Sequence, residues 1–484
     1  MRRLARAVVP TLMLLSSVSC ATNTAQRMPG SPLAEDALTA RARAIHERVM
    51  ALDTHVDIDP GSFRVEGLNY SQRLSSQVDL TKMEVGGLDA VFFSIYVGQG
   101  ALDSAGYSRA YATDTAKFNA VHTLAEQIAP ARIAIAYTAE DARRIYASGK
   151  KVALMGVENG YGIGTDITRV KEFYDRGARY MSLSHNGHSQ LSDSNTGEAT
   201  NDWMWHGLSP LGKRVIAEMN RVGIMIDISH PSRESMMQSI ALSRAPIMAS
   251  HSGVRALCNV SRNLDDEQLR ALAKNGGVVQ MVAFRSYVKC DPAGAAARTK
   301  AIAALIMEFS INPAARGGVA GGRGGAGGGA GFARGPVAGL AGPSCSANAA
   351  GGAAPFRTAA MVAADSQVAL LSPERRTQYQ ARLGAIADRY PQQSAATVKD
   401  FVDHIDYGVK LMGLDHVGIS SDFDGGGGVD GFNCALESIN VTRELVRRGY
   451  TEEQIAKIWS GNLLRVMGEV ENTAKRIQAG DLKS

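Results

Sequence analysis

The sequence of 484 residues lacks the features of several large protein classes. Its net charge is only +5, and its positive residues form no dense cluster beyond the N-terminus, which argues against nucleic-acid binding. The apolar run from Ala7 to Leu15 is too short to span a bilayer as a helix, so a permanent transmembrane anchor is not expected. The glycines from Gly425 to Gly428 lack the Lys and Ser/Thr of a phosphate-binding loop, which argues against a phosphoesterase.

What the sequence does contain fits an exported globular protein. Hydrophobic residues make up 45% of the chain and charged residues 20%, enough for a substantial core. Arg2, Arg3 and Arg6 precede the apolar run, and small residues follow it as far as Cys20. This order is typical of a signal peptide, which we predict over residues 1–20. We therefore expect the mature protein in the bacterial periplasm or on its membranes.

Cleavage of this segment has two alternative outcomes. Ser17-Val18-Ser19-Cys20 resembles a bacterial lipoprotein box, but it lacks the usual Leu three residues before the Cys. Lipid attachment at Cys20, giving a membrane-anchored lipoprotein, and ordinary cleavage nearby both remain open. Residues 21–40, with a stretch rich in Ala, Thr and Pro to about Pro32, are predicted to form a flexible tether.

The chain holds five cysteines, and in an exported protein they favour disulfide bonds. With Cys20 in the signal segment, Cys258, Cys290, Cys345 and Cys434 remain. These allow three pairings, and spacing alone does not choose among them.

From Arg41 onward, short apolar runs rich in β-branched residues alternate with amphipathic stretches of helical length. The eight expected strands are 50–55, 88–97, 152–158, 178–184, 224–229, 246–250, 277–284 and 416–421. The expected helices include 108–128, 210–222, 233–243, 265–274, 396–412, 435–448 and 452–470. This alternation predicts an α/β protein, a (β/α)8 TIM barrel over residues 41–475. The alternative, an open doubly wound sheet, lacks a glycine fingerprint after the first strand.

One segment departs from this alternation. Residues 316–355 are dominated by Gly and Ala, with almost no bulky apolar side chains. Such a segment buries too little apolar surface to offset its ordering entropy, so we predict a flexible, low-complexity surface insertion in the barrel. A mobile lid over the site is the alternative interpretation.

Ionisable residues collect at the carboxyl ends of the expected strands, where barrel enzymes place their catalytic groups. These residues are His55, Asp57, Glu158, His185, His230, His251 and Asp422. A single His at a strand end is usually a structural residue, and His-x-Asp alone is a weak motif. The indication lies in the joint pattern, because candidate ligands end several separate strands. By contrast, His46, His122, His206, His404 and His416 fall elsewhere and are assigned to structure or surface.

Imidazoles together with carboxylates form a mixed nitrogen and oxygen donor set. Such a set suits Zn²⁺, with Mn²⁺, Co²⁺ or Fe²⁺ as alternatives. Two ions that share a carboxylate would activate a water and polarise a scissile carbonyl. The pattern therefore predicts a hydrolase with two metal ions.

In its ordered motifs the chain resembles the membrane dipeptidase family, also called renal dipeptidase-like metallopeptidases, within the amidohydrolase-type barrels. The resemblance runs from about Ala51 to Val470, apart from the Gly-rich insertion. The motifs that carry it are Asp53-Thr54-His55-Val56-Asp57, Gly156-Val157-Glu158-Asn159-Gly160, Asp227-Ile228-Ser229-His230-Pro231-Ser232, Ala249-Ser250-His251-Ser252, Ser421-Asp422-Phe423-Asp424-Gly425 and Gly461-Asn462-Leu463-Leu464-Arg465-Val466.

The resemblance implies a role for each candidate residue. His55 and Asp57 would bind one zinc, His230 and His251 the other, and Glu158 would bridge the two ions. His185 matches the family residue that contacts the substrate and stabilises the oxyanion. Asp422 matches the acid/base that transfers the proton. Arg262, in Asn259-Val260-Ser261-Arg262-Asn263, matches the Arg that holds the substrate's terminal carboxylate.

The expected activity is therefore zinc-dependent hydrolysis of free dipeptides, including those with a C-terminal D-residue. One alternative keeps the two metals but acts on a lactone, a cyclic amide or an N-acyl amino acid. Another is a catalytically silent binding lipoprotein. The resemblance also implies a Cys258–Cys290 disulfide and a tendency to form homodimers. The pairing of Cys345 with Cys434 has no such support, because Cys345 lies inside the Gly-rich insertion.

Overall fold

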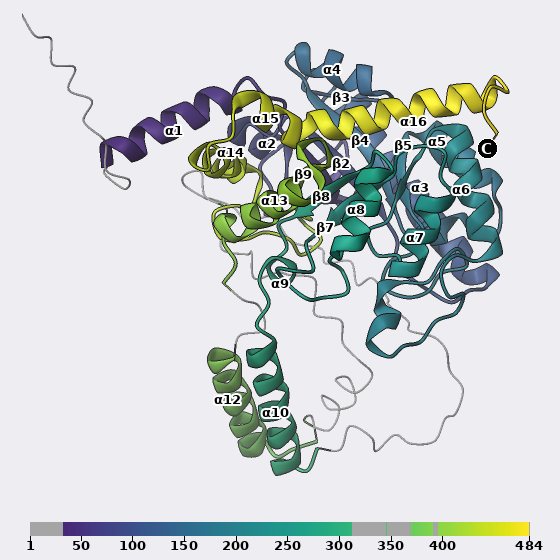
Figure 1. The fold of residues 1–484 in the computed structure, drawn as a ribbon. Helices are drawn as coiled ribbons and strands as arrows, with labels where there is room; N and C mark the ends of the chain where they lie inside the picture. Colours follow the sequence, from purple (N-terminus) through teal and green to yellow (C-terminus); the bar gives the residue numbers. More distant parts are fainter. Residues whose placement is uncertain (1–31, 312–344, 346–367, 369, 391–394, 484) are drawn as a thin grey trace, which may run out of the picture.

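A computed structural model describes residues 32–311, 345, 368, 370–390 and 395–483. Eight parallel strands lie in the order β1-β2-β4-β5-β6-β7-β8-β9. Their bounds are Leu52–Asp57, Ala90–Tyr96, Lys151–Glu158, Ala178–Ser182, Met225–Asp227, Met248–Ser252, Val278–Val282 and Val417–Ser420. Just past β9, Phe423 bridges back to Val56 of β1, and the amide of Asp57 donates to the carbonyl of Phe423 at 2.9 Å. The sheet is therefore a nearly closed barrel, as predicted (Figure 1).

All eight predicted strands are present within a few residues of their expected bounds. The structure adds one strand that the sequence pattern did not reveal, β3 (Ile133–Ile135), which pairs with the start of β4. Three residues are too few for a hydrophobic period to stand out, so β3 depends on its pairing with β4.

The strands are buried on both faces, as β4 illustrates. Val152 and Leu154 belong to a cluster inside the barrel, whereas Ala153, Met155 and Val157 belong to the larger cluster under the surrounding helices. Successive side chains of a strand point to opposite faces, so an uninterrupted apolar run fills both layers. Residues of α16, among them Leu463 and Met467, join the inner cluster beside the strand starts.

Helices connect the strands and form the outer layer. They are α2 (Leu80–Gly86), α3 (Ser104–Thr123), α4 (Ala139–Ala147), α5 (Thr168–Arg176), α6 (Pro210–Val222), α7 (Arg233–Leu242), α8 (Asp266–Lys274), α9 (Arg285–Val288), α13 (Val398–Met412), α14 (Ser438–Arg447), α15 (Glu452–Ala456) and α16 (Asn462–Gln478). Helix α6 shows why the predicted bounds hold. Its N-cap Ser209 accepts from the amide of Gly212, Pro210 begins the helix, and Gly223 ends it at φ 97°.

The N-terminal segment departs from the prediction. Residues 21–31 lie outside the described residues, but 32–40 begin helix α1 (Pro32–His46), so a flexible tether is wrong for that part. Ala42 and Ile45 are buried, Arg443 of α14 forms an ion pair with Glu35, and its Nε donates to the Thr39 hydroxyl at 3.1 Å. These contacts stabilise the helix. The predicted signal peptide and the site of lipidation also lie outside the described residues.

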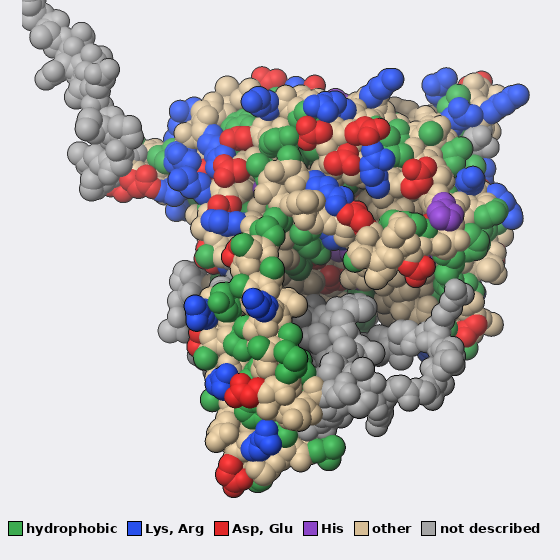
Figure 2. Space-filling view, turned by 60° about the horizontal axis from the view of Figure 1, so that its bottom comes forward, with side chains coloured by type: hydrophobic (Ala, Val, Ile, Leu, Met, Phe, Trp, Pro, Cys, Tyr) green, Lys and Arg blue, Asp and Glu red, His purple; other side chains and the backbone are tan. Residues whose placement is uncertain are grey.

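The Gly-rich insertion is flanked by two helices that were not predicted, α10 (Pro292–Glu308) and α12 (Pro373–Arg389). They pack on each other through a small cluster of Leu305, Phe309 and Tyr379 and project from the barrel (Figure 1). Figure 2 shows hydrophobic and charged side chains mixed on the surface of this projection. The predicted insertion over 316–355 lies outside the described residues apart from Cys345.

Two disulfides are present, Cys258–Cys290 and Cys345–Cys434. The first is the pairing that the resemblance implied, and the second is the pairing that lacked support. Within the described residues, none of the helices combines the length and the apolar character that crossing a membrane requires.

Candidate metal centre and active site

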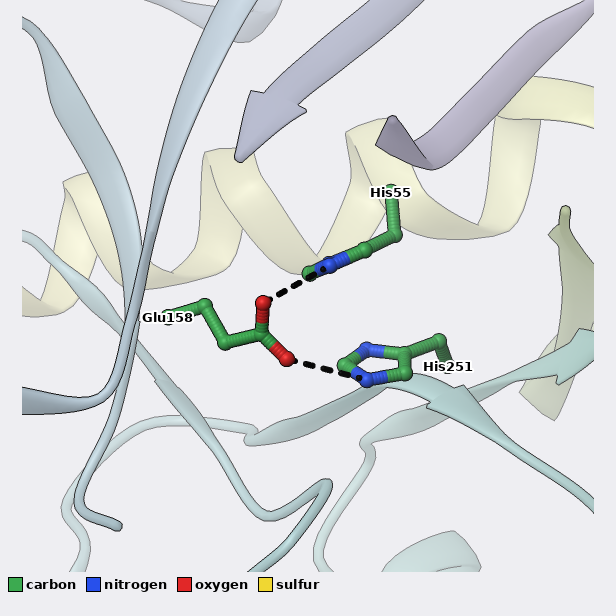
Figure 3. A group of neighbouring side chains, drawn as sticks. All are labelled: His55, Glu158 and His251. Carbon is green, nitrogen blue, oxygen red and sulfur yellow. Dashed lines mark hydrogen bonds and ion pairs between the residues drawn. The ribbon is translucent and has the colours of Figure 1, made fainter. Parts of the chain in front are cut away.

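The strand ends bring the predicted ionisable residues to one place, with Glu158 at its centre. His55 Nε2 lies 3.1 Å from Glu158 Oε2, and His230 Nε2 lies 3.0 Å from Glu158 Oε1. The Nε2 atoms of His251 and His185 lie 3.4 and 3.5 Å from Glu158 Oε1. Figure 3 shows the carboxylate of Glu158 between the rings of His55 and His251. One carboxylate from β4 thus contacts four imidazoles that come from or follow β1, β5, β6 and β7.

Hydrogen bonds on the far side of two rings fix where their protons lie. The hydroxyl of Tyr180 donates to the carbonyl of Thr54 at 3.2 Å, so it accepts from Nδ1 of His55 at 2.9 Å. The hydroxyl of Ser250 donates to Asp227 at 2.6 Å, so it accepts from Nδ1 of His251 at 2.7 Å. Both rings therefore carry a proton on Nδ1, so Nε2 is the atom that faces Glu158, where a proton or a cation can lie between the two.

A second group of donors lies beside the first. One ligand atom each from His55, Asp57 and Asp422 falls within 4.8 Å of the others. Asp57 Oδ1 is buried without a hydrogen bond among the described residues, and Lys117 Nζ of α3 lies 4.0 Å away. Lys117 also sits over the ring of Tyr96, 5.2 Å from its centroid. The sequence reasoning missed Lys117, because a helical Lys carries no signal that it points into a barrel.

The loop after β9 holds Asp422 in an unusual backbone conformation. Asp422 has φ 58° and Asp424 has φ 62°, in the left-handed region that most residues avoid. A Cβ at Gly425 would lie 2.2 Å from Asp57 Oδ2 and 2.3 Å from Asp422 Oδ1. The backbone at Gly425 therefore lies directly against both carboxylates, and no larger residue fits there without displacing them.

The pKa values in this cluster diverge. Burial opposes ionisation of Glu158, but the neighbouring imidazoles, His55 first and then His185, His230 and His251, hold its pKa well below the usual range. Burial works against a charged His55 as well, yet the surrounding carboxylates, Glu158 first, raise its pKa to about 10. Glu158 is thus the anion of the centre.

Two further groups are held neutral by burial. Burial, with a smaller contribution from the charge of Arg262, lowers the pKa of His185 to about 4. Burial, aided by the negative charges of Asp57 and Glu158, raises the pKa of Asp422 well above its usual range. A neutral imidazole and an acid that retains a proton therefore lie beside the anionic centre.

Arg262 lies at the edge of the centre and is 7% exposed. Its Nη2 donates to the carbonyl of His251 at 3.1 Å, and its guanidinium lies 5.4 Å from the ring centroid of Tyr287. Its Nε has no hydrogen-bond partner, and among the described residues no carboxylate forms an ion pair with it. A buried cation with an unsatisfied donor is a ready site for an anion.

The donor set fits metal ions. Nε2 of His230 and Nε2 of His251 lie only 3.0 Å apart, and the proton of His251 is on its far nitrogen. Two ring nitrogens that face each other so closely need a proton or a cation near both. Buried imidazole nitrogens and carboxylate oxygens within 4.8 Å of one another are the donors that zinc and similar divalent ions take.

The sequence predicted the residues of the cluster but not the side chains that hydrogen-bond to them and orient them. All seven predicted donors and Arg262 lie in or beside it, whereas His46, His122, His404 and His416 hydrogen-bond to other parts of the fold. Tyr180, Ser250 and Asp227 were missed as supports. A signal was available for Ser250 and Asp227, because both belong to the motifs quoted above.

Comparison with known proteins gives a family match. The family model described as membrane dipeptidase, peptidase family M19, matches residues 39–481. The dipeptidase aclJ of Aspergillus oryzae is 26% identical over 408 residues, which cover 84% of this chain and 72% of that protein. The dipeptidase tcpJ of Claviceps purpurea is 26% identical over 406 residues, which cover 83% of this chain and 71% of that protein.

Solved structures share the fold. The probable dipeptidase PvdM of Pseudomonas aeruginosa superposes with a TM-score of 0.69 at 30% identity, over 91% of this chain and 100% of that chain. A metallopeptidase of Rhodobacter sphaeroides, liganded with a phosphinate mimic of the dipeptide L-Ala-D-Ala, gives a TM-score of 0.59 at 18% identity. That likeness covers 87% of this chain and 99% of that chain, and it bears on the fold alone.

Proposed function

The chain belongs to the membrane dipeptidase family, peptidase family M19, and on this premise we propose that it is a zinc dipeptidase that hydrolyses free dipeptides. The family membership makes it a peptide-bond hydrolase of the metallopeptidase type. The proposal adds the metal, the number of ions and the size of the substrate.

The observation that carries the substrate assignment is the buried, unpaired guanidinium of Arg262. It lies close enough to the donor cluster that its charge adds to burial in lowering the pKa of His185 and His230. A substrate carboxylate bound to Arg262 would satisfy its free donor and place the adjacent amide near Glu158. With the C-terminal carboxylate in that place, the residue after the scissile bond is the last one of the substrate.

The chain would hold two ions between its strand ends. His55 and Asp57 would bind one, His230 and His251 the other, and Glu158 would contact both, since its two oxygens face different imidazoles. When bound, such ions supply Lewis acidity and lower the pKa of water. The anionic character of Glu158 and the Nδ1 protons of His55 and His251 suit these residues to that role.

Two further groups complete the proposed chemistry. His185, with its lowered pKa, would donate a hydrogen bond to the oxygen that becomes negative when the amide carbonyl is attacked. With cations held nearby, the carboxyl of Asp422 would be ionised, and as a carboxylate it would take the proton of the attacking water and pass it to the leaving amine. Its place beside Asp57 and His55 suits both transfers.

Substrates with a C-terminal D-residue belong to the proposal. The phosphinate in the Rhodobacter sphaeroides structure mimics L-Ala-D-Ala, which makes this stereochemistry the first to examine. We further propose that the protein acts outside the cytoplasm, as its N-terminal segment suggests. Attachment through a lipid at Cys20 and assembly into homodimers are parts of the proposal that need their own tests.

The test compares zinc-loaded protein on L,L and L,D dipeptides, matching tripeptides and N-acetylated dipeptides. We expect turnover of free dipeptides only, and a loss of about 100-fold or more in kcat for Asp422→Asn. Asp415→Asn is the matched control, because Asp415 is an exposed partner of Lys457 and lies at the opposite end of β9 from Asp422. Activity confined to acylated or cyclic compounds would overturn the substrate assignment, and bound metal without any turnover would overturn the enzyme assignment.

A further inference from the structure

Gln77, in the segment between β1 and α2, contacts the loop that carries Asp422. Its backbone amide donates to Asp424 Oδ1 at 2.7 Å, and the next amide, of Val78, donates to Asp424 Oδ2 at 3.1 Å. In return, the amide of Asp424 donates to the side-chain oxygen of Gln77 at 2.7 Å. Asp424 is therefore held on both its side chain and its backbone.

The same glutamine also holds the far part of this loop. Its side-chain Nε2 donates to the backbone carbonyls of Gly427 and Asn433 at 2.9 and 2.8 Å. The backbone carbonyl of Gln77 accepts from the amide of Ala435 at 3.1 Å. Every polar group of Gln77 is thus bonded to residues 424–435. No regular strand or helix connects those residues to one another between β9 and the short helix at Ala435–Glu437.

The loop needs such support because its conformation is disfavoured. Asp422 and Asp424 both have positive φ, which a non-glycine residue holds only when surrounding contacts impose it. Gly427 has no room for a side chain, since a Cβ would lie 1.9 Å from the carbonyl oxygen of Ser421. A small rotation of this loop would therefore move the carboxylate of Asp422 relative to His55 and Asp57.

We infer that Gln77 is a positioning residue for the proposed reaction: it holds the carboxylate of Asp422 at the donor cluster and acts on turnover through Asp422 alone. The inference rests on the proposed function, in which Asp422 transfers the proton. It assigns a role to a residue that touches neither the substrate nor the donor atoms. A residue needed only for folding would instead affect stability and all steps alike.

The experiment measures kcat and KM of the zinc-loaded protein for a dipeptide in Gln77→Ala, Asp422→Asn and the double variant. For Gln77→Ala we expect kcat to fall about 10- to 100-fold, with KM within about threefold and zinc content unchanged. In the Asp422→Asn background the same substitution should cause no further loss, because its effect passes through Asp422. Hydrogen exchange of residues 422–435 should be faster in Gln77→Ala.

The matched control is Asn275→Ala. Asn275, which follows α8, also bridges backbone groups of a loop, accepting from the amide of Ile247 at 2.8 Å and donating to the carbonyl of Ala245 at 3.4 Å. That loop precedes β7, at the opposite end of the strand from His251, so kcat should stay within about twofold. If Gln77→Ala folds poorly, Gln77→Glu retains the acceptor for Asp424 but loses both donors, and it should show the same selective loss in kcat.

An unchanged kcat in a folded Gln77 variant would overturn the inference, and so would an equal further loss on top of Asp422→Asn. Wild-type protein that turns over no dipeptide would instead refute the proposed function. In that case, the exchange rate of residues 422–435 still reports whether Gln77 holds the loop.

Discussion

A single residue, Arg262, carries most of the substrate proposal. Its guanidinium is buried, lies over the ring of Tyr287 and has a donor, Nε, without a partner among the described residues. A lysine ammonium would keep the charge but lose the planar, two-pronged geometry that matches a carboxylate. Arg262→Lys therefore separates the need for charge from the need for shape.

We expect Arg262→Lys to lower kcat/KM for a free dipeptide about 10- to 100-fold, because a charge-assisted hydrogen bond contributes about 1.5–3 kcal/mol. Steady-state kinetics on the dipeptide and on its C-terminal amide provide the measurement. The wild type should strongly prefer the free acid, and the variant should lose most of that preference. Equal use of both compounds by the wild type would rule out carboxylate recognition by Arg262.

His46 offers a residue-scale test of stability away from the site. It is buried, accepts from the hydroxyl of Thr442 at 2.8 Å and donates to the carbonyl of Gly86 at 3.1 Å, which requires the neutral ring. Burial lowers its pKa below 6.5 despite the bond to Gly86. Between that lowered pKa and 6.5, the unfolded chain binds more protons than the folded one. The contribution of His46 is thus complete above about pH 6.5 and is lost as the pH falls.

His46→Gln keeps a donor for Gly86 but loses the acceptor for Thr442, at a cost of about 1–2 kcal/mol near pH 7.5. The gap in unfolding free energy between wild type and variant should narrow by pH 5, as measured by denaturant titration at both pH values. A gap that is constant or widens toward pH 5 would show that His46 is not held neutral in the folded protein.

At the scale of elements, the strands and helices that could be predicted are those whose own sequence has a clear apolar pattern. The eight barrel strands were predictable because each is an apolar run buried on both faces, as in β4. Helices α10 and α12 were not, because α10 has an Ala-rich sequence without a clear apolar stripe, and among the described residues its buried side chains pack in a small cluster with α12. Helix α1 was missed for a similar reason, since its short apolar face is buried by packing against α14, which is distant in the sequence.

The β9 loop gives an element-scale prediction through Gly427. A methyl group there would overlap the carbonyl of Ser421, so Gly427→Ala should shift the loop and lower kcat about 10-fold or more. Gly384→Ala is the matched control, because Gly384 lies inside α12 with nothing within 4 Å of a Cβ. That control should keep full activity and be slightly more stable, by up to about 1 kcal/mol.

The measurements are Tm from thermal melts and kcat on a dipeptide, for both glycine variants and the wild type. Full activity in Gly427→Ala would mean that the loop tolerates displacement, which would also weaken the case for Gln77.

At the scale of the whole molecule, the donor cluster depends on barrel closure. The donors were predictable because they lie at the ends of strands. Three contacts were not: Tyr180 with His55, Lys117 with Asp57, and Gln77 with the loop that carries Asp422. Those contacts join segments far apart in the chain, and no local pattern encodes them. The candidate ligands were predictable, whereas the side chains that orient them required the closed barrel.

Removing the metal tests whether bound cations at the donor cluster stabilise the folded barrel. Without bound cations, the carboxylates of Asp57, Glu158 and Asp422 face one another in a buried space, so the folded state loses stabilisation. Chelation should abolish dipeptide turnover and lower Tm by several degrees, and added zinc should restore both. Calorimetry with elemental analysis should find about two ions per chain before chelation. A Tm unchanged by complete removal of the metal would contradict this coupling.

The spread of the donors along the chain, from His55 to Asp422, has a consequence for biosynthesis. A ribosome that has released the chain as far as His251 has delivered most of the donors, but β8, β9 and the bridge from Phe423 to Val56 are still missing. The unfinished polypeptide therefore has no assembled donor cluster, so we expect metal to bind only after β8 and β9 have joined the barrel. A metal ion bound at the cluster would then report that the barrel of that copy has closed.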